Sequence, residues 1–379
     1  MSHEVTQSGT DQTPLLELDT LKVSGDFHQM GHAYGSHYKT LIRRFVEMRL
    51  ASAESYFGDW GRGSVDQLLS VGAECWAAAQ SFHPEGAREH EGIAAAVGIS
   101  PERLYATTNM TDVRDVVLLP EVQPPSEDEG CTSALIPPTR SRAGLYGQTW
   151  DLNPPDIEYI VGLHRLPDHG LETWTVTCAG CLTLVGMNEN GVSVGTTNLK
   201  TWRSKVGVGY LSVLHKAVSQ KTWSIASEVC ENAPVAGAHS YWVGGIEGGV
   251  EWERSPEEAF KRDTIQGAIG RANHCLFKPH QEREAVTPTP SSQSRFNRVS
   301  TLVQTPRYQT VEGLKQLFSD RSDGVHSINR YPEDEQGTTT NAVVITSPEE
   351  GVMYACRGSA DRGAWHRLTF DRHATRAIL

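Results

Sequence analysis

The sequence predicts an α+β fold in which a mainly helical first part is followed by a part made mostly of strands. Before residue 118, apolar side chains recur at intervals of three and four, which is the spacing of one helix face. After residue 131 the sequence changes to short β-type runs separated by Gly, Asn and Asp. Two stacked antiparallel sheets with helices outside, a four-layer αββα sandwich, accommodate this order, as other α+β arrangements also do.

The helices of the first part follow a short strand expected at residues 15–23. The first clear helix begins near residue 37, and its apolar positions are Tyr38, Leu41, Ile42, Phe45 and Met48. The next begins at Ser64, because Ser64 and Gln67 form a capping-box pattern. A third helix runs through residues 91–97. A fourth starts at Ser100, since Ser caps a helix and Pro101 fits its first turn.

A single cysteine marks the junction between the two parts. Residues 118–129 are rich in proline and carboxylates, which cannot pack a core, so they are expected to form an exposed linker. Cys131 then follows Gly130 and begins an apolar run, which places it on the first residue of a strand. An arbitrary cysteine is more often a small buried hydrophobe than a nucleophile. The exposed linker favours the nucleophile here.

The second part is read as strands interrupted by helices. Strands are expected at residues 131–136, 145–151, 158–166, 172–178, 182–187, 192–196, 240–243, 250–252, 342–346, 351–356 and 365–370. Helices are expected at 211–218, at 225–231 and through 314–318, and residues 278–294 are expected to be a long loop. The turn at residues 188–191, Asn-Glu-Asn-Gly, is typical of a β-hairpin.

Composition narrows the class of partner. The chain has 379 residues, 38% of them hydrophobic, which is enough for a sizeable core. Its net charge of −12, with no basic cluster, disfavours nucleic acid and anionic membrane surfaces. The N-terminal sequence lacks the pattern of a signal peptide, and no apolar run approaches the ~20 residues that span a bilayer, so a cytoplasmic protein is expected. Seven cysteines form no disulfide framework in a chain of this length.

Four motifs follow one another along the chain: Gly130-Cys131-Thr132, then residues 147–151, 185–192 and 272–276. Together they resemble the acyl-coenzyme A:6-aminopenicillanic-acid acyltransferase family, of peptidase C45 type, a branch of the N-terminal-nucleophile hydrolases. The resemblance covers nearly the whole chain from about residue 20. It implies an αββα fold and a precursor that cleaves itself between Gly130 and Cys131. The pieces, 1–130 (mainly helical) and 131–379 (catalytic), would together form one domain.

The chemistry expected of Cys131 follows from reference pKa values. A thiol with a pKa of about 8.5 needs a base at neutral pH. Cleavage would supply one, because the new α-amino group of Cys131, with a pKa of about 7.7–8.0, can take the thiol proton and return it to a leaving amine. In the precursor the thiol would attack the carbonyl of Gly130, which a glycine leaves unobstructed.

The resemblance assigns further residues to the site. Asp151 would orient the α-ammonium group, its alternative being an ordinary turn aspartate. Asn273 would donate its side-chain amide to an oxyanion, its alternative being a loop or cap residue. Trp150 and Ser255 are candidate substrate-binding residues, although Ser-Pro also opens ordinary turns. His274 is expected to be structural, and no metal is expected.

Other features of the sequence qualify the resemblance. Residues 292, 295 and 298 fit a Ser-x-x-Arg-x-x-Arg pattern of the family, expected to start a helix whose arginines make ion pairs. Residues 336–339 lack the Ser-Arg pair of the fungal penicillin enzyme, which argues against a β-lactam substrate. Cys178 and Cys181 form a C-x-x-C, but a lone pair cannot close a tetrahedral zinc site and is expected to be structural.

The leading hypothesis is a self-processing amidohydrolase or acyltransferase that cleaves a small-molecule N-acyl amide through a thioester on Cys131. It needs no cofactor. An acyl-CoA-dependent N-acyltransferase, with acyl-CoA as co-substrate, is the nearest alternative. A thiol redox or zinc-binding protein using Cys178 and Cys181 is an alternative of another class, and a catalytically silent binding protein is a third. The expected partners are a small amide or amine and the two fragments of the precursor, with homo-oligomerisation left open.

Overall fold

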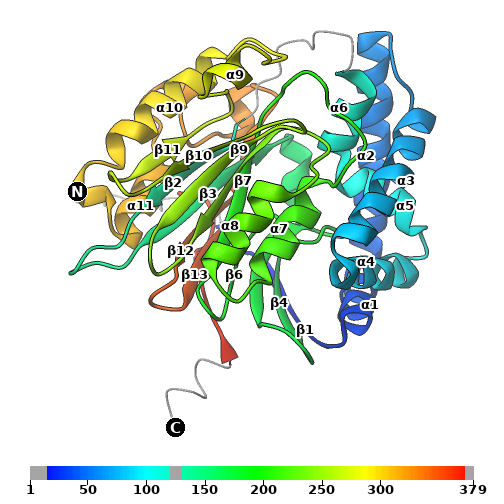
Figure 1. The fold of residues 1–379 in the computed structure, drawn as a ribbon, viewed down its shortest axis with the longest axis horizontal. Helices are drawn as coiled ribbons and strands as arrows, with labels where there is room; N and C mark the ends of the chain where they lie inside the picture. The colour runs from blue at the N-terminus through cyan, green and yellow to red at the C-terminus, as the bar shows by residue number, and fades with distance from the viewer. Residues whose placement is uncertain (1–14, 120–129, 372–379) are drawn as a thin grey trace, which may run out of the picture.

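Two β-sheets stacked face to face form the centre of the computed structural model, which describes residues 15–119 and 130–371 (Figure 1). The eight-stranded sheet has the order β1 (Asp19–Gly25), β4 (Ile160–Pro167), β5 (Thr173–Cys178), β6 (Val185–Asn188), β7 (Ser193–Asn198), β8 (His239–Gly244), β9 (Gly249–Arg254), β10 (Ala259–Asp263). The six-stranded sheet has the order β11 (Ile269–Arg271), β2 (Thr132–Ile136), β3 (Leu145–Leu152), β12 (Thr339–Ser347), β13 (Val352–Arg357), β14 (His366–Thr369). Most of the expected linker, residues 120–129, lies outside the described residues.

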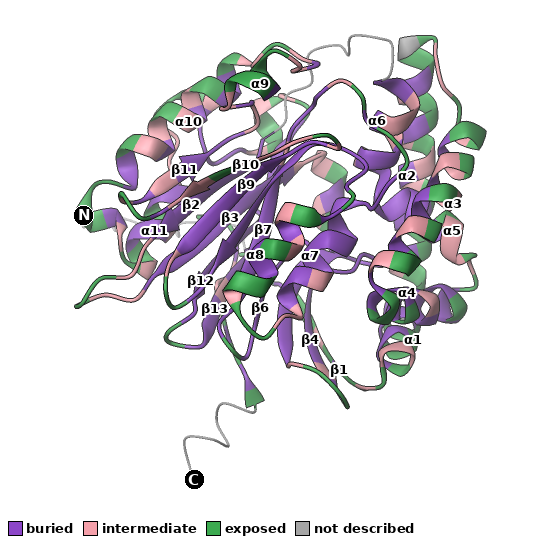
Figure 2. Cartoon of the chain, viewed as in Figure 1, coloured by how far each residue is buried: buried purple, intermediate pink, exposed green. Residues whose placement is uncertain are grey.

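Helices cover the outer face of each sheet. Against the eight-stranded sheet pack α7 (Tyr210–Val218) and α8 (Trp223–Asn232), and against the six-stranded sheet pack α10 (Pro290–Leu302) and α11 (Val311–Phe318) (Figure 1). The inner strands are buried, whereas the edge strands β1, β10 and β14 are partly exposed, as are the outward faces of α8 and α10 (Figure 2). These layers are the expected αββα sandwich.

Side chains from β3 join the two sheets. The Tyr146 ring lies against Gly244 of β8, where a Cβ would come within 2.3 Å of the ring, and its hydroxyl donates to the carbonyl of Gly245 at 2.9 Å. The Gln148 side-chain oxygen accepts hydrogen bonds from the backbone N–H of Thr196 and the indole N–H of Trp242, both at 2.8 Å. The buried Gln148 side chain therefore has hydrogen-bond partners inside the sandwich, and these bonds hold the two sheets together.

The first part of the chain is a helical body packed against the sandwich. It contains α1 (Phe27–His37), α2 (Lys39–Trp60), α3 (Val65–Phe82), α4 (Pro84–Val97), α5 (Pro101–Thr108) and α6 (Met110–Leu118). The expected caps are present: the Ser64 and Ser100 hydroxyls accept the N–H of Gln67 at 3.1 Å and of Arg103 at 3.3 Å. Within the described residues, no helix combines the length and the apolar character needed to cross a membrane.

Contacts buried on both sides tie this body to the second part. Strand β1 pairs in parallel with β4 and so extends the eight-stranded sheet. Buried polar contacts also cross the boundary: the ion pairs Glu89–Arg165 at 2.7 Å and Arg49–Asp156 at 3.1 Å, and a hydrogen bond of 2.7 Å between Asp112 and Nε2 of His239. Breaking such a pair by removing one partner typically costs about 3–5 kcal/mol, because the other charge stays buried. The residues before and after Cys131 therefore form one folded unit.

The structure contains helices that the sequence did not predict, at residues 27–37 and within 278–294. Helix α1 was not predicted, because its glycines lower helix propensity. They are needed for close packing, since a Cβ on Gly31 would lie 1.9 Å from the Glu89 carbonyl oxygen of α4. The loop expected at residues 278–294 was wrong at its end, where α10 begins at Pro290 with the Thr289 hydroxyl accepting the N–H of Ser292 at 3.1 Å. The short α9 (Lys278–Gln281) also falls in that span.

Candidate active site

A cavity of about 500 Å³ lies where the helical body meets the sandwich. One side is lined from α2 and α6, and the other from β3, β7, β8 and the segment before α9. Cys131, Trp150, Asp151 and Asn273 all line it, so the structure gathers four of the expected site residues. Its volume suits a small organic molecule.

Cys131 stands immediately before β2 and is 7% exposed. Because β2 pairs with β3, with Thr132 opposite Thr149, the thiol comes close to the end of β3. Its Sγ lies 3.8 Å from the backbone oxygen of Asp151. The strand begins one residue later than expected, at Thr132, and the cysteine keeps the strand-end position at the cavity that a nucleophile requires.

Asp151 is buried at the same place. Burial raises the pKa of its carboxyl to about 6, against the opposing effect of the Arg330 and Arg295 guanidinium groups. Gly130 lies so close that a Cβ there would come within 2.3 Å of the Asp151 Cβ. Only glycine fits at residue 130 without displacing the carboxylate, which gives the glycine a steric role beside the expected cleavage site.

Asn273 is held in one orientation by its neighbours. Its Oδ1 accepts a hydrogen bond from Arg295 at 3.1 Å, and its Nδ2 donates to the backbone oxygen of Asn198 at 3.0 Å. Since Arg295 can only donate, the oxygen and nitrogen of the amide are assigned without ambiguity. The second hydrogen on Nδ2 makes no hydrogen bond to the described residues, and the amide lines the cavity. It is a donor available to a bound ligand.

Arg295 was not expected in the site. The arginine on α10 is fully buried and donates to the carbonyl of Cys131 and to Asn273, so it connects the two residues directly. The Ser-x-x-Arg-x-x-Arg pattern was the available sign, and its expected ion pair is found for Arg298, which bonds to Asp320 at 2.6 Å. No local pattern distinguishes the two arginines, because the difference arises from which face of α10 meets β2.

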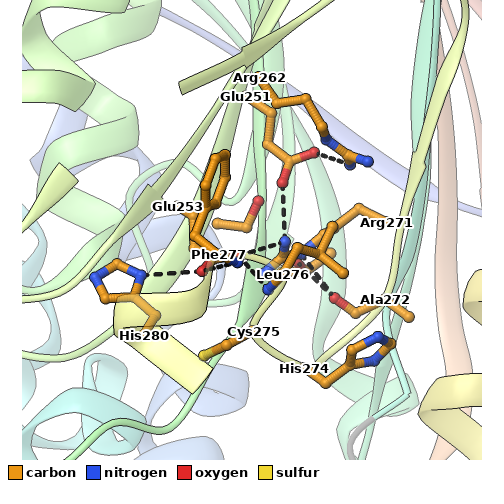
Figure 3. Close-up of polar contacts among 12 residues, drawn as sticks. Glu251, Glu253, Arg262, Arg271, Ala272, His274, Cys275, Leu276, Phe277 and His280 are labelled. Carbon is orange, nitrogen blue, oxygen red and sulfur yellow. Dashed lines mark hydrogen bonds and ion pairs between the residues drawn. The ribbon is translucent and has the colours of Figure 1, made fainter. Parts of the chain in front are cut away.

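A buried carboxylate fixes the segment that carries Asn273. Glu253 of β9 accepts hydrogen bonds from Arg271 at 2.7 Å, from the N–H of Leu276 at 2.8 Å and from Nδ1 of His280 at 3.0 Å (Figure 3). Burial alone would raise the pKa of Glu253, but the donors from His280 and Arg271 lower it to about 2. The carboxylate is therefore charged and holds the chain on both sides of residue 273.

Ser255 belongs to this network and is not among the residues that line the cavity. Its hydroxyl oxygen accepts the N–H of Glu258 at 3.1 Å, and it lies 3.1 Å from Nε2 of His280. The structure thus places the expected substrate-binding serine behind the Asn273 segment. His274 is structural in its contacts, since its Nδ1 lies 2.8 Å from the Ser292 hydroxyl. Burial, with nearby Arg271, lowers the pKa of His274 to about 4.

Cys178 ends β5, and Cys181 follows it across a tight turn with Gly180 at φ +90°. Both are free and buried, and burial raises the pKa of each thiol. Reactive cysteines have a lowered pKa, so these thiols do not resemble a redox pair. In the described part of the chain, the group of side chains close enough to share a metal ion is His164, Glu172 and Asp371, which includes neither cysteine.

Comparison with known proteins shows the family of the chain. The model of the family described as acyl-coenzyme A:6-aminopenicillanic acid acyl-transferase matches residues 139–362, which include Asp151 and Asn273 and begin after Cys131. The 40 kDa form of acyl-coenzyme A:6-aminopenicillanic-acid-acyltransferase from Emericella nidulans is 28% identical over 224 residues, or 57% of this chain. The match spans 61% of that curated relative, about three fifths of its length.

Solved structures with a similar arrangement are more distant. A mutant of conjugated bile acid hydrolase from Clostridium perfringens is 12% identical, with a TM-score of 0.44 over 63% of this chain and 93% of that one. The Caenorhabditis elegans ortholog of N-acylethanolamine-hydrolyzing acid amidase is 13% identical, with a TM-score of 0.43 over 63% of this chain and 100% of that one. Since the family model spans more than half of the sequence, the chain belongs to the acyl-coenzyme A:6-aminopenicillanic acid acyl-transferase family.

Proposed function

We propose that this protein is a self-processing cysteine amidohydrolase and acyltransferase that cleaves a small-molecule N-acyl amide through a thioester on Cys131. The observation that carries the proposal is the meeting of Cys131, Asp151 and Asn273 in one cavity, although they are far apart in the sequence. Membership of an acyltransferase family supports the same chemistry. The buried, high-pKa thiols of Cys178 and Cys181 give no support to the redox or zinc alternative.

The first reaction activates the enzyme. The Cys131 thiol adds to the carbonyl carbon of Gly130, the C–N bond breaks, and the peptide moves from nitrogen to sulfur. Water then hydrolyses the thioester, which leaves a carboxylate on Gly130 and a free α-amino group on Cys131. The steric fit of Gly130 against Asp151 supports this step, because it brings the scissile bond beside a buried carboxyl group.

The second reaction uses the new α-amino group. It takes the thiol proton, the thiolate attacks the substrate carbonyl, and Asn273 stabilises the oxyanion through its available N–H. Collapse expels the amine, which receives the proton, and leaves the acyl group on Cys131. Asp151 holds the α-ammonium form in place. Transfer of the acyl group to water completes hydrolysis, and water is always present as an acceptor.

Transfer to an amine is the second candidate. The name of the curated relative, an acyl-coenzyme A-dependent acyltransferase, favours it. An acyl-CoA would then supply the acyl group, and an amine bound in the cavity would receive it. Measuring the products in the presence of both water and a primary amine distinguishes the two outcomes, because both arise from one thioester.

Analysis of the purified protein by intact mass and N-terminal sequencing tests the proposal. We expect two polypeptides, residues 1–130 and 131–379, that copurify without a covalent link. The buried ion pairs between the helical body and the sandwich keep them together. An active preparation that remains a single uncut chain contradicts the proposed activation.

Asp151 gives a prediction for the uncut chain, best measured in Cys131→Ala. Burial raises the folded-state pKa of Asp151 from 3.8 to about 6. The folded chain therefore holds the proton more tightly than the unfolded chain, and the free energy of unfolding falls as pH rises from about 4 to 6. Asp151→Asn should raise it at pH 7 by up to roughly 3 kcal/mol, at about 1.4 kcal/mol per pKa unit, and change it little at pH 3.5.

Urea unfolding of Cys131→Ala with and without Asp151→Asn, at pH 3.5 and pH 7, measures this difference in the free energy of unfolding. Asp168→Asn, at an exposed carboxylate that does not line the cavity, serves as the control. Equal effects of Asp151→Asn at both pH values would show that folding does not raise the pKa of this carboxyl group.

A further inference from the structure

The helical body contributes two arginines to the cavity. Arg49 of α2 and Arg114 of α6 both line it, whereas Asp151 is the single carboxylate among the described lining residues. Neither arginine belongs to the catalytic group, and both come from the part of the chain before residue 130. The cavity wall opposite the sandwich thus presents two guanidinium groups, each of which also pairs with a carboxylate outside the lining.

The guanidinium group of Arg49 is held in place, and one of its N–H donors makes no hydrogen bond to the described residues. It is 6% exposed, its Nη2 lies 3.1 Å from Asp156, and its guanidinium lies 4.9 Å from the centre of the Phe45 ring. Asp156 lies behind the arginine and does not line the cavity. The Nε–H of Arg49 is buried without a hydrogen-bond partner in the described part of the protein. The guanidinium group of Arg49 is thus held at the cavity wall by a buried carboxylate and an aromatic ring.

Arg114 lies on the neighbouring helix in a similar setting. Its guanidinium stacks over the Tyr56 ring at 4.2 Å, and its Nε forms a long ion pair with Asp115 at 3.8 Å. Tyr56 and Met110 give the surrounding wall an apolar surface. Planar guanidinium groups match carboxylates through paired hydrogen bonds, and an apolar surrounding strengthens that attraction.

We propose that the substrate amide carries a carboxylate group, which Arg49 and Arg114 bind while the amide carbonyl lies at Cys131. The inference rests on the proposed function and adds to it the substrate class, N-acyl amides with an anionic end. It also assigns substrate selection to the helical body and bond cleavage to the sandwich. The carboxylate can belong to the amine half, as in an N-acyl amino acid, or to the acyl half, as in a dicarboxylic monoamide.

Two matched pairs of compounds test the proposal. N-phenylacetylglycine and N-phenylacetylglycinamide differ by a carboxylate on the amine half, and the benzylamides of glutaric and butyric acid differ by one on the acyl half. We expect kcat/KM for the charged member of one pair to exceed that of its neutral partner by roughly 10- to 100-fold. The pair that shows the preference identifies the half. Equal values within both pairs overturn the inference.

Variants of the arginines connect the preference to these side chains. Arg114→Met should raise KM for the preferred charged compound and lower its kcat/KM at least 10-fold more than that of its neutral partner. Arg49→Lys keeps a charge beside Asp156, so it folds, but it loses the planar donor fork and should weaken the preference. Arg44→Met is the control, because Arg44 lies on the same helix in an exposed ion pair with Glu158. A parallel loss on charged and neutral compounds in Arg114→Met also overturns the inference.

Calorimetric titration with the same four compounds separates this inference from the proposed function. Tighter binding of a charged compound that is never hydrolysed would contradict the proposed reaction and support the arginine site. Hydrolysis of both pairs without any preference would support the reaction and overturn the site.

Discussion

Cys131→Ala is expected to abolish both cleavage of the chain and turnover of substrate. The thiol is the group that attacks Gly130 in the first reaction and the substrate in the second, so no part of the proposed chemistry proceeds without it. Loss of a nucleophile in an enzyme of this kind lowers kcat on the order of 10⁶-fold. Mass spectrometry of the purified variant over several days, together with an amidase assay, measures both effects.

Two further variants test whether the effect is specific to the thiol of Cys131. Cys131→Ser should still cleave slowly, because an alkoxide is harder to form than a thiolate. Cys230→Ala removes a thiol buried on α8, away from the cavity, and should process and turn over normally. Normal cleavage in Cys131→Ala would place the nucleophile elsewhere in the chain.

The sequence predicted the elements whose causes are local. The Ser64 and Ser100 caps need only the residues within one helical turn, and both are present. The hairpin at residues 188–191 needs only a backbone that can adopt positive φ at Gly191, which has φ +80°. Such features depend on a few neighbouring residues, and a pattern in the sequence is enough to identify them.

Features that depend on distant contacts could not be predicted in this way. Helix α1 contains Gly31, a residue that weakens an isolated helix and that here allows α4 to approach closely. In the sequence, Arg295 and Arg298 look equivalent. The structure distinguishes them, because the Cys131 carbonyl before β2 accepts a hydrogen bond from Arg295. Ser255 matched a family pattern, but the pattern does not show that its hydroxyl faces His280 and not the cavity. In each case the decisive neighbour is far away in the sequence.

The same distinction applies to the candidate site. Motif order and the family resemblance indicated Cys131, Asp151 and Asn273, and the structure brings them together, which supports the proposed roles without testing them. The arginines of the cavity wall carried no pattern at all. They line one cavity because the tertiary fold brings Arg114 of α6 over the Tyr56 ring of α2, where both helices face the sandwich.

Asn273→Ala is expected to lower kcat and kcat/KM together by roughly 10²–10³, with little change in KM. The reason is that the available N–H of Asn273 meets an oxygen that becomes negative only in the transition state. The variant also removes the acceptor of Arg295, so a structural effect must be separated from a catalytic one. Steady-state kinetics and the unfolding temperature are therefore measured on the same preparations.

Asn273→Asp supplies the separation. It keeps the size of the side chain and the acceptor for Arg295, and replaces Nδ2, which also donates to the Asn198 carbonyl, with a carboxylate oxygen that would repel an oxyanion. If the donor to the oxyanion matters, Asn273→Asp is at least as inactive as Asn273→Ala. A role limited to binding Arg295 predicts that Asn273→Asp recovers activity. Arg298→Lys is the control, because Arg298 lies on the same helix as Arg295 but pairs with Asp320 and does not line the cavity. It should leave kcat unchanged. A rise in KM at constant kcat in Asn273→Ala would instead assign the asparagine to ground-state binding, and the oxyanion donor would then lie elsewhere in the cavity wall.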